Sequence, residues 1–324
     1  MTTLLSIAAA RRDRITGIAC GMGAGILWGL VFIAPELARE FGPLQLSVGR
    51  YLCYGLIAAV MIAPRWHALV RRISRQQWLS LIGLAFTGNT LYYILLVSAV
   101  QNGGVAMTSL VIGFLPVVIT IIGSRERNAV PLRKLASSLL FCVAGVVCIG
   151  WQALVGLGAG LLSDQVFGLV CAVGALVSWT AFAVGNVRCL TKLQHISAHD
   201  WNSLIGLVTG AQSIVLIPLA IIFETTQHGS DAWLRFGAVS VGVAVLASIF
   251  GNVLWNQMSR RLPLTLVGQM ILFETLFALL YGFLWEHRLP TLLEIAAILL
   301  VVMSVLTCFA AHRNPISQNA ATVP

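Results

Sequence analysis

The sequence predicts an all-α integral membrane protein with ten transmembrane helices, and two observations support this fold class. The first is composition, since 58% of the 324 residues are hydrophobic and only 10% are charged. A soluble domain has about 25% charged residues, so this composition excludes an ordinary soluble globular protein. The second is the length of the apolar runs, because a bilayer core about 30 Å thick needs about 20 apolar residues in a helix, and ten such runs occur.

Short polar segments separate the apolar runs. Several of these breaks contain proline or glycine, as at Pro43, 102–104 and Pro263, and such residues readily end an apolar helix. No break is long enough to hold a soluble domain, and the polar stretch 312–324 is predicted to be a disordered cytoplasmic tail. The ten predicted spans lie near 15–35, 44–63, 78–100, 103–123, 135–152, 166–187, 201–223, 236–257, 264–286 and 291–311.

The basic residues determine the predicted orientation of the spans. Of the 20 lysines and arginines, 16 fall in one set of alternate loops, three fall in the other set, and Arg50 lies inside the second span. Cytoplasmic loops carry the excess of positive charge, so both termini are predicted to be cytoplasmic. The net charge of +9 follows from this topology, and no nucleic-acid partner is expected because the basic residues form no separate domain.

The chain contains an internal repeat. The segment GIACGMGAGILW (17–28) matches GLVCAVGALVSW (168–179) at five of twelve positions, and the pattern Gly-Asn-x-Leu-aromatic occurs at 88–92 and again at 251–255. Chance recurrence of small residues and tryptophan in apolar helices is the alternative explanation of either match alone. The two matches keep the same order along the chain, which favours a duplicated unit.

Two repeats of five helices are therefore predicted, at 1–152 and 166–311. Because five is odd, the second repeat enters the membrane upside down relative to the first. Inverted repeats are typical of secondary transporters, whose substrate site lies near the bilayer midplane between the repeats.

The rival functional classes are a channel and an intramembrane enzyme. All four aspartates lie in loops or termini, and the Walker, Gly-x-Ser-x-Gly and His-Glu-x-x-His sequences do not occur. We therefore predict no enzyme activity, no bound metal and no cofactor. A polar interior is compatible with a channel as well as with a carrier, so the channel alternative stays open.

Four features recur in order along the chain. They are Trp28-Gly29-x-x-Phe32, Arg50, Leu115-Pro116-Val117, and FETLFA at 273–278 followed by Glu286. In this order they resemble the drug/metabolite transporter superfamily, in its ten-helix branch built from two EamA-type repeats. Thr275 stands where that family usually has a proline, which is a departure from the pattern.

The resemblance implies a multi-pass exporter of the bacterial inner membrane that moves amino acids, aromatic or other neutral ones, by alternating access. A central cavity between the two repeats would bind the substrate. Export of another small metabolite or drug-like compound is the alternative within the same superfamily. The expected partners are this small molecule and membrane lipids; a monomer is compatible with the sequence, which leaves the oligomeric state open.

Two of the nine tryptophans, Trp28 and Trp179, lie deep in predicted spans. The other seven, among them Trp201 and Trp255, lie near span ends, where an aromatic belt at the membrane interface explains them. The first and sixth spans run in opposite directions, so Trp28 and Trp179 are expected to straddle the midplane. We predict that both flank the substrate pathway; packing fixed by the repeat is the alternative.

Two charges lie inside predicted spans. An unpaired ionised acid in the middle of the ninth span, where Glu274 lies, would be very unfavourable, so this residue is predicted to be protonated, paired or exposed to a water-filled cavity. It could accept a substrate ammonium or carry a proton; a neutral acid in a helix-packing hydrogen bond is the alternative. Arg50 is predicted to bind a substrate carboxylate, to pair with an acid or to reach the surface. The candidate acids are Glu36, Glu40 and Glu274.

Polar residues of the repeated Gly-Asn pattern complete the predicted site. Asn89 and Asn252 are equivalent within it, and Tyr92 and Tyr93 lie close to the first. Substrate hydrogen bonding is the functional prediction, and hydrogen bonding between helices is the alternative. The full predicted substrate-binding set is Trp28, Arg50, Asn89, Tyr92, Tyr93, Trp179, Asn252 and Glu274. A stripe of small residues at Gly17, Gly21, Gly25 and Gly29 predicts close packing of the first span.

Overall fold

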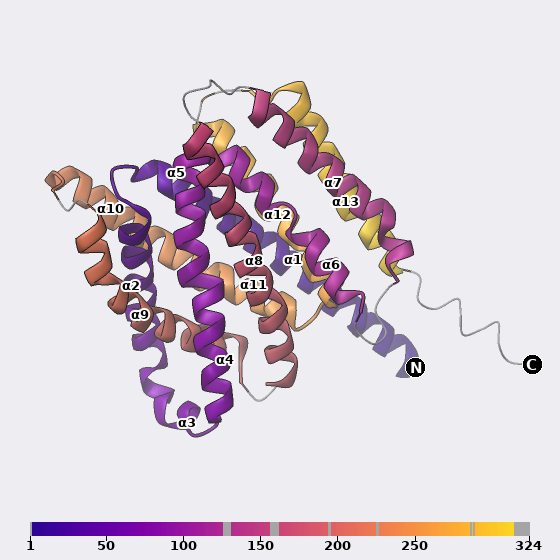
Figure 1. The fold of residues 1–324 in the computed structure, drawn as a ribbon. Coiled ribbons are helices and arrows are strands. Elements are labelled where there is room, and N and C mark those ends of the chain that lie inside the picture. The colour runs from indigo at the N-terminus through magenta and orange to yellow at the C-terminus, as the bar shows by residue number, and fades with distance from the viewer. Residues whose placement is uncertain are drawn as a thin grey trace, which may run out of the picture.

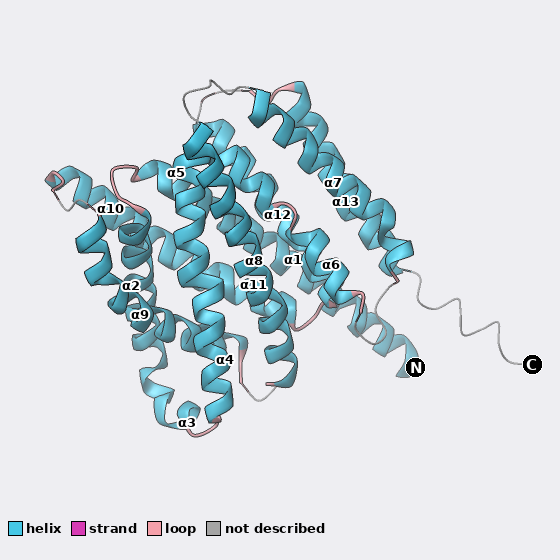
Figure 2. Ribbon diagram, viewed as in Figure 1, coloured by secondary structure: helices cyan, strands magenta, loops and turns pink. Residues whose placement is uncertain are grey.

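All the regular structure in the described part of the chain is helical. The computed structural model describes residues 2–125, 131–155, 162–193, 196–224, 227–285, 287 and 289–313, and no strand occurs within these ranges (Figure 2). The α-helices, coloured by position in Figure 1, are α1 (Thr2–Leu37), α2 (Pro43–Ile62), α3 (Trp66–Val70), α4 (Arg75–Ala85), α5 (Leu91–Ile112), α6 (Leu115–Gly123), α7 (Leu132–Val155), α8 (Leu162–Lys192), α9 (Ala198–Phe223), α10 (Ser230–Val243), α11 (Asn252–Ser259), α12 (Leu264–Trp285) and α13 (Leu292–Arg313).

Three short segments continue these helices with a different winding. The segment η1 (Ala63–Arg65) is a 3₁₀ turn after α2. The segments η2 (Phe86–Thr90) and η4 (Ala244–Gly251) are π-helical. Because η2 joins α4 to α5 and η4 joins α10 to α11, each lies inside a longer, nearly continuous helix.

Seven helical stretches in the described residues are long and apolar enough to cross a membrane. They are Arg11–Leu37, Pro43–Val70, Arg75–Val105, Ser163–Lys192, Ala198–Phe223, Ser230–Ser259 and Leu266–Trp285. The predicted spans at 103–123, 135–152 and 291–311 are not among these seven, although α6, α7 and α13 show that the chain is largely helical there. The protein is therefore a multi-pass helical membrane protein.

The predicted break at 102–104 falls where the chain leaves helical geometry. Gly104 has φ +80° and ψ 165° within the residues of α5. A positive φ favours glycine, which lacks the Cβ that would clash. The chain turns again between α5 and α6, at Gly113 and Phe114, so the predicted span at 103–123 consists of two shorter helical pieces.

Helices that are distant in sequence pack against one another in pairs. The helix α1 lies along α12, α5 along α8, and α2 along α9. The remaining large pair, α7 with α13, forms one side of the molecule (Figure 1). Each pair joins a helix from before residue 156 to one from after it, so the core of the protein lies between its two halves.

Glycines allow the close approach of α1 to α12. A Cβ added at Gly25 would lie 2.7 Å from the Cβ of Phe273, and one at Gly29 would lie 2.9 Å from the Cβ of Phe277. Ordinary van der Waals contact is 3.4–4 Å, so side chains here would push the two helices apart. The close packing predicted from the glycine stripe is confirmed.

The C-terminal end departs slightly from prediction. The predicted tail begins at residue 312, but α13 continues to Arg313. The rest of that tail, and Glu286 near the end of the ninth predicted span, lie outside the described residues.

Candidate functional site

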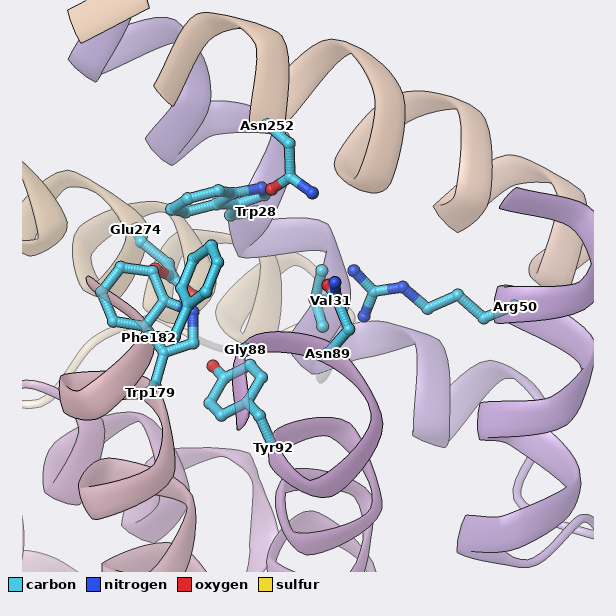
Figure 3. A pocket seen from close by; sticks show the side chains of 10 residues that line it. All are labelled: Trp28, Val31, Arg50, Gly88, Asn89, Tyr92, Trp179, Phe182, Asn252 and Glu274. Carbon is cyan, nitrogen blue, oxygen red and sulfur yellow. The ribbon is translucent and has the colours of Figure 1, made fainter. Parts of the chain in front are cut away.

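A small pocket with a cavity volume of about 20 Å³ lies between the two halves (Figure 3). This is room for about one water molecule, so the lining side chains would have to move apart to admit a substrate. The pocket is lined by Trp28, Val31, Arg50, Gly88, Asn89, Tyr92, Trp179, Phe182, Asn252 and Glu274. Seven of the eight sequence-predicted residues are in this set. The eighth, Tyr93, does not line the pocket but packs its ring against the guanidinium of Arg50.

Arg50 reaches the pocket from α2 and is only 6% exposed. Its Nε donates a hydrogen bond of 3.0 Å to Ser248 Oγ in η4. The guanidinium carbon lies 4.4 Å from the ring centre of Tyr93 and 5.0 Å from that of Tyr51, so cation–π contacts stabilise the charge. Nη1 is buried and has no hydrogen-bond partner in the described structure.

This placement excludes two of the expected roles of Arg50. Its burial rules out a side chain that reaches the membrane surface. Pairing with Glu36 or Glu40 is also excluded in this structure, because Glu36 forms an ion pair with Arg39 and Glu40 forms one with Arg235, each at 3.4 Å. A free Nη1 at the pocket leaves a bond donor for a ligand carboxylate.

Glu274 lies on α12 and is only 4% exposed. Within the described residues its carboxyl group makes no hydrogen bond and no ion pair. The helix-packing hydrogen bond considered from the sequence is therefore not seen. Figure 3 shows that Glu274 and Arg50 approach the pocket from opposite sides.

Three tryptophans pack together at the site, and two of them, Trp28 and Trp179, line the pocket. The ring centres of Trp28 and Trp179 lie 5.6 Å apart, and each lies 5.1 Å from that of Trp255. Edge-to-face and tilted contacts at these distances are favourable for aromatic rings. In Figure 3, Trp28, Trp179 and Phe182 gather at the Glu274 end of the pocket.

The aromatic-belt interpretation is wrong for Trp255 and Trp201. Trp255 is 1% exposed, and Trp201 is 0% exposed with its Nε1 donating to Asn186 Oδ1 at 2.8 Å. Position near a span end gives depth along the helix axis but not the face of the helix. Trp255 lies one turn beyond Asn252 and therefore faces the centre of the protein, a position that its repeated Gly-Asn-x-Leu-aromatic pattern could have indicated.

The two asparagines lie at the π-helical segments. Asn89, in η2, donates through Nδ2 to Thr209 Oγ1 of α9 at 3.1 Å. Its side chain thus makes the interhelical hydrogen bond that was the alternative to substrate binding, while it also lines the pocket. Asn252 follows η4 directly and is 9% exposed.

Three further lining residues were not predicted from the sequence. Val31 and Phe182 lie one turn beyond Trp28 and Trp179, and the repeat that relates the two tryptophans also relates these two residues. The third, Gly88, precedes Asn89. The i, i+3 spacing within the repeat could have identified Val31 and Phe182.

The chain is similar to a family of transporters, to two proteins of known sequence and to one solved structure. The EamA-like transporter family matches residues 15–151 and 166–310. An inner membrane protein of Escherichia coli K12, YtfF, is 32% identical over 95% of this chain and 99% of its own length. An uncharacterized transporter of Archaeoglobus fulgidus is 24% identical over 82% of this chain and 87% of its own. One solved crystal structure has a similar fold, with a TM-score of 0.67 at 19% identity, covering 92% of this chain and 99% of that one.

Proposed function

Because the chain belongs to the EamA-like transporter family, we propose that it is a secondary transporter that exports amino acids, aromatic or other neutral ones, across the bacterial inner membrane. The substrate would bind in the pocket between the halves and cross by alternating access. The observation that most supports a zwitterionic substrate is the placement of Arg50 and Glu274 on opposite sides of this pocket.

The proposed architecture is ten spans in two inverted repeats of five, with both termini cytoplasmic. Reciprocal contacts support it. Ser138 Oγ of α7 donates to the Ser304 carbonyl of α13 at 2.8 Å, and Ser304 Oγ donates to the Ser138 carbonyl at 2.7 Å. Such an exchange is what a two-fold axis between equivalent helices produces.

A second contact near the same proposed axis joins α2 and α9. A Cβ added at Gly55 would lie 2.6 Å from Gly210 Cα, and one at Gly210 would lie 2.7 Å from Gly55 Cα. Each helix therefore offers the other its glycine at the same crossing point. In transporters with inverted repeats the substrate site lies where the repeats meet, and the residues that line this pocket come from both proposed repeats.

The pocket combines repeated and unrepeated residues. The repeat relates Trp28 to Trp179, Val31 to Phe182 and Asn89 to Asn252, and all six line the pocket. Arg50 and Glu274 break this symmetry, because among the described residues that line the pocket they are the two charged ones, and the repeat does not relate them. Opposite charges on the two sides suit a substrate that itself has two different charged ends.

The energetics also favour a ligand that pairs both charges. A buried charge without a partner is costly, and here the guanidinium has a free Nη1 while the carboxyl group has no bonded partner in the described chain. A substrate carboxylate at Arg50 and an ammonium at Glu274 would satisfy both. The tryptophan faces beside Glu274 would add cation–π attraction for the ammonium.

Transport by the purified protein tests this proposal. Proteoliposomes loaded with an unlabelled amino acid should transiently accumulate the labelled amino acid by counterflow, with saturation, and Arg50→Gln and Glu274→Gln variants should not. Arg235, which is exposed and pairs with Glu40, provides a matched control as Arg235→Gln. If no amino acid exchanges, the substrate class is wrong. Current without saturation or exchange would indicate a channel instead.

A further inference from the structure

Two π-helical segments interrupt long helices beside the pocket. The segment η2 contains Gly88 and Asn89, and η4 ends at Gly251, directly before Asn252. These are the two copies of the repeated Gly-Asn pattern. π-helical turns inside α-helices are frequent at functional sites. Backbone carbonyls of both segments also accept hydrogen bonds from side chains of other helices.

Two side chains donate hydrogen bonds to backbone carbonyls of η2. Ser178 Oγ, from α8 in the second half, donates to the Thr87 carbonyl at 2.7 Å. The hydroxyl of Tyr51, from α2 in the first half, donates to the Asn89 carbonyl at 3.0 Å. One donor therefore comes from the opposite half and one from the same half.

The donors to η4 follow the same plan. Trp28 Nε1, from α1 in the first half, donates to the Ala247 carbonyl at 3.0 Å. Asn202 Nδ2, from α9 in the second half, donates to the Ser248 carbonyl at 3.3 Å and to the Ile249 carbonyl at 3.5 Å. Again one hydrogen bond joins the two halves and the other lies within one half.

Glycine lets an aromatic ring from the opposite half press against each segment. A Cβ at Gly88 would lie 2.3 Å from the ring of Phe182, and a Cβ at Gly251 would lie 2.6 Å from Trp28 Nε1. Neither segment can therefore move toward the other half without displacing that ring. Trp28 therefore contacts η4 in two ways: it donates a hydrogen bond to the Ala247 carbonyl, and its ring packs against Gly251.

A continuous set of contacts connects the two segments through the pocket. Trp28 bonds to η4 and its ring meets that of Trp179 edge-on at 5.6 Å. Trp179 follows Ser178 directly on α8, and Ser178 bonds to η2. A displacement of either π-helical segment must therefore move a tryptophan that lines the pocket.

We propose that η2 and η4 are a coupled pair of hinges, joined through Trp28, Trp179 and Ser178, so that loosening one segment loosens the other. In this arrangement Ser178 is a positioning residue, because it contacts no pocket surface and acts by holding η2. A substrate that contacts Trp28 or Trp179 would act on both hinges at once. The coupling of the two segments does not depend on which substrate the protein transports.

Hydrogen–deuterium exchange of the full-length protein in lipid nanodiscs, without substrate, tests the coupling. Ser178→Ala removes one hydrogen bond of ordinary strength, so amide exchange in 86–90 should quicken by about five-fold. If the hinges are coupled, exchange in 244–251 should also quicken, by at least about two-fold. Peptides from α13, which lies away from both segments (Figure 1), should be unchanged.

The matched control is Thr180→Ala. Thr180 lies on the same helix and its Oγ1 donates at 2.7 Å to the Leu176 carbonyl of that helix, so its loss should change neither segment. The reciprocal variant Trp28→Phe keeps a ring against Trp179 but loses the bond to η4, and it should quicken exchange in both segments. If Ser178→Ala does not fold, Tyr51→Phe removes the other donor to η2. A response confined to the segment that lost its bond would overturn the proposal.

Discussion

Replacing Gly55 by alanine should separate α2 from α9 at the crossing where their backbones touch. The new Cβ would lie 2.6 Å from Gly210 Cα, whereas ordinary contact needs 3.4–4 Å. The obstructing atom is backbone and cannot rotate away, so the helices must move apart by about 1 Å at a point that both halves share. Overpacking of this kind costs about 1–3 kcal/mol.

The expected result for Gly55→Ala is a melting temperature lowered by several degrees, on the order of 5 °C. The melting temperature can be measured by heating the purified protein in detergent and quantifying the remaining folded protein by size-exclusion chromatography. Gly83→Ala is the matched control, because a Cβ at Gly83 meets nothing within 4 Å and alanine is the better helix former. If Gly55→Ala melts at or above the wild-type temperature while Gly83→Ala behaves as expected, the backbone contact is not as the structure shows it.

Three further changes test other parts of the structure. Arg50→Gln should weaken amino acid binding by roughly 10- to 150-fold, the loss of a charged hydrogen bond worth about 1.5–3 kcal/mol, as measured by calorimetric titration; unchanged affinity would remove Arg50 from the site. Ser138→Ala and Ser304→Ala should show a coupling of about 0.6–1.7 kcal/mol in a double-mutant cycle of unfolding, and strict additivity would argue against the reciprocal bonds. Trp255→Ala should destabilise the protein by about 3–5 kcal/mol because it leaves a cavity under two other tryptophans; a loss below 1 kcal/mol would mean that this ring is not buried.

Much of the helical architecture is visible in the sequence because the bilayer imposes it. Apolar runs of membrane-spanning length and basic loops reflect physical constraints that act on each segment separately. The break at 102–104 could also be predicted locally, because glycine residues mark it and Gly104 adopts a backbone conformation that favours glycine. The winding of η2 and η4 could not be predicted, because their carbonyls contact side chains such as Ser178 and Trp28 that lie far away in the chain.

The candidate site shows the same division. Arg50 and Glu274 stand out in the sequence because a charge inside a span is rare, and Trp28 and Trp179 stand out by their depth. Depth alone misassigned Trp255, since the face of a helix that meets the pocket depends on how the helix is rotated against its neighbours. Tyr93 was expected in the pocket and instead packs against Arg50, with its ring centre 4.4 Å from the guanidinium carbon.

If Arg50 and Glu274 hold the opposite charges of one zwitterionic substrate, a cycle of protein and ligand changes will separate their contributions to binding. Binding would be measured for a transported amino acid, for its decarboxylated amine and for its deaminated acid, each with wild-type protein, Arg50→Gln and Glu274→Gln. Arg50→Gln should weaken binding of the amino acid and the acid but spare the amine, and Glu274→Gln should weaken binding of the amino acid and the amine but spare the acid. Equal losses for all three ligands in both variants would contradict this assignment.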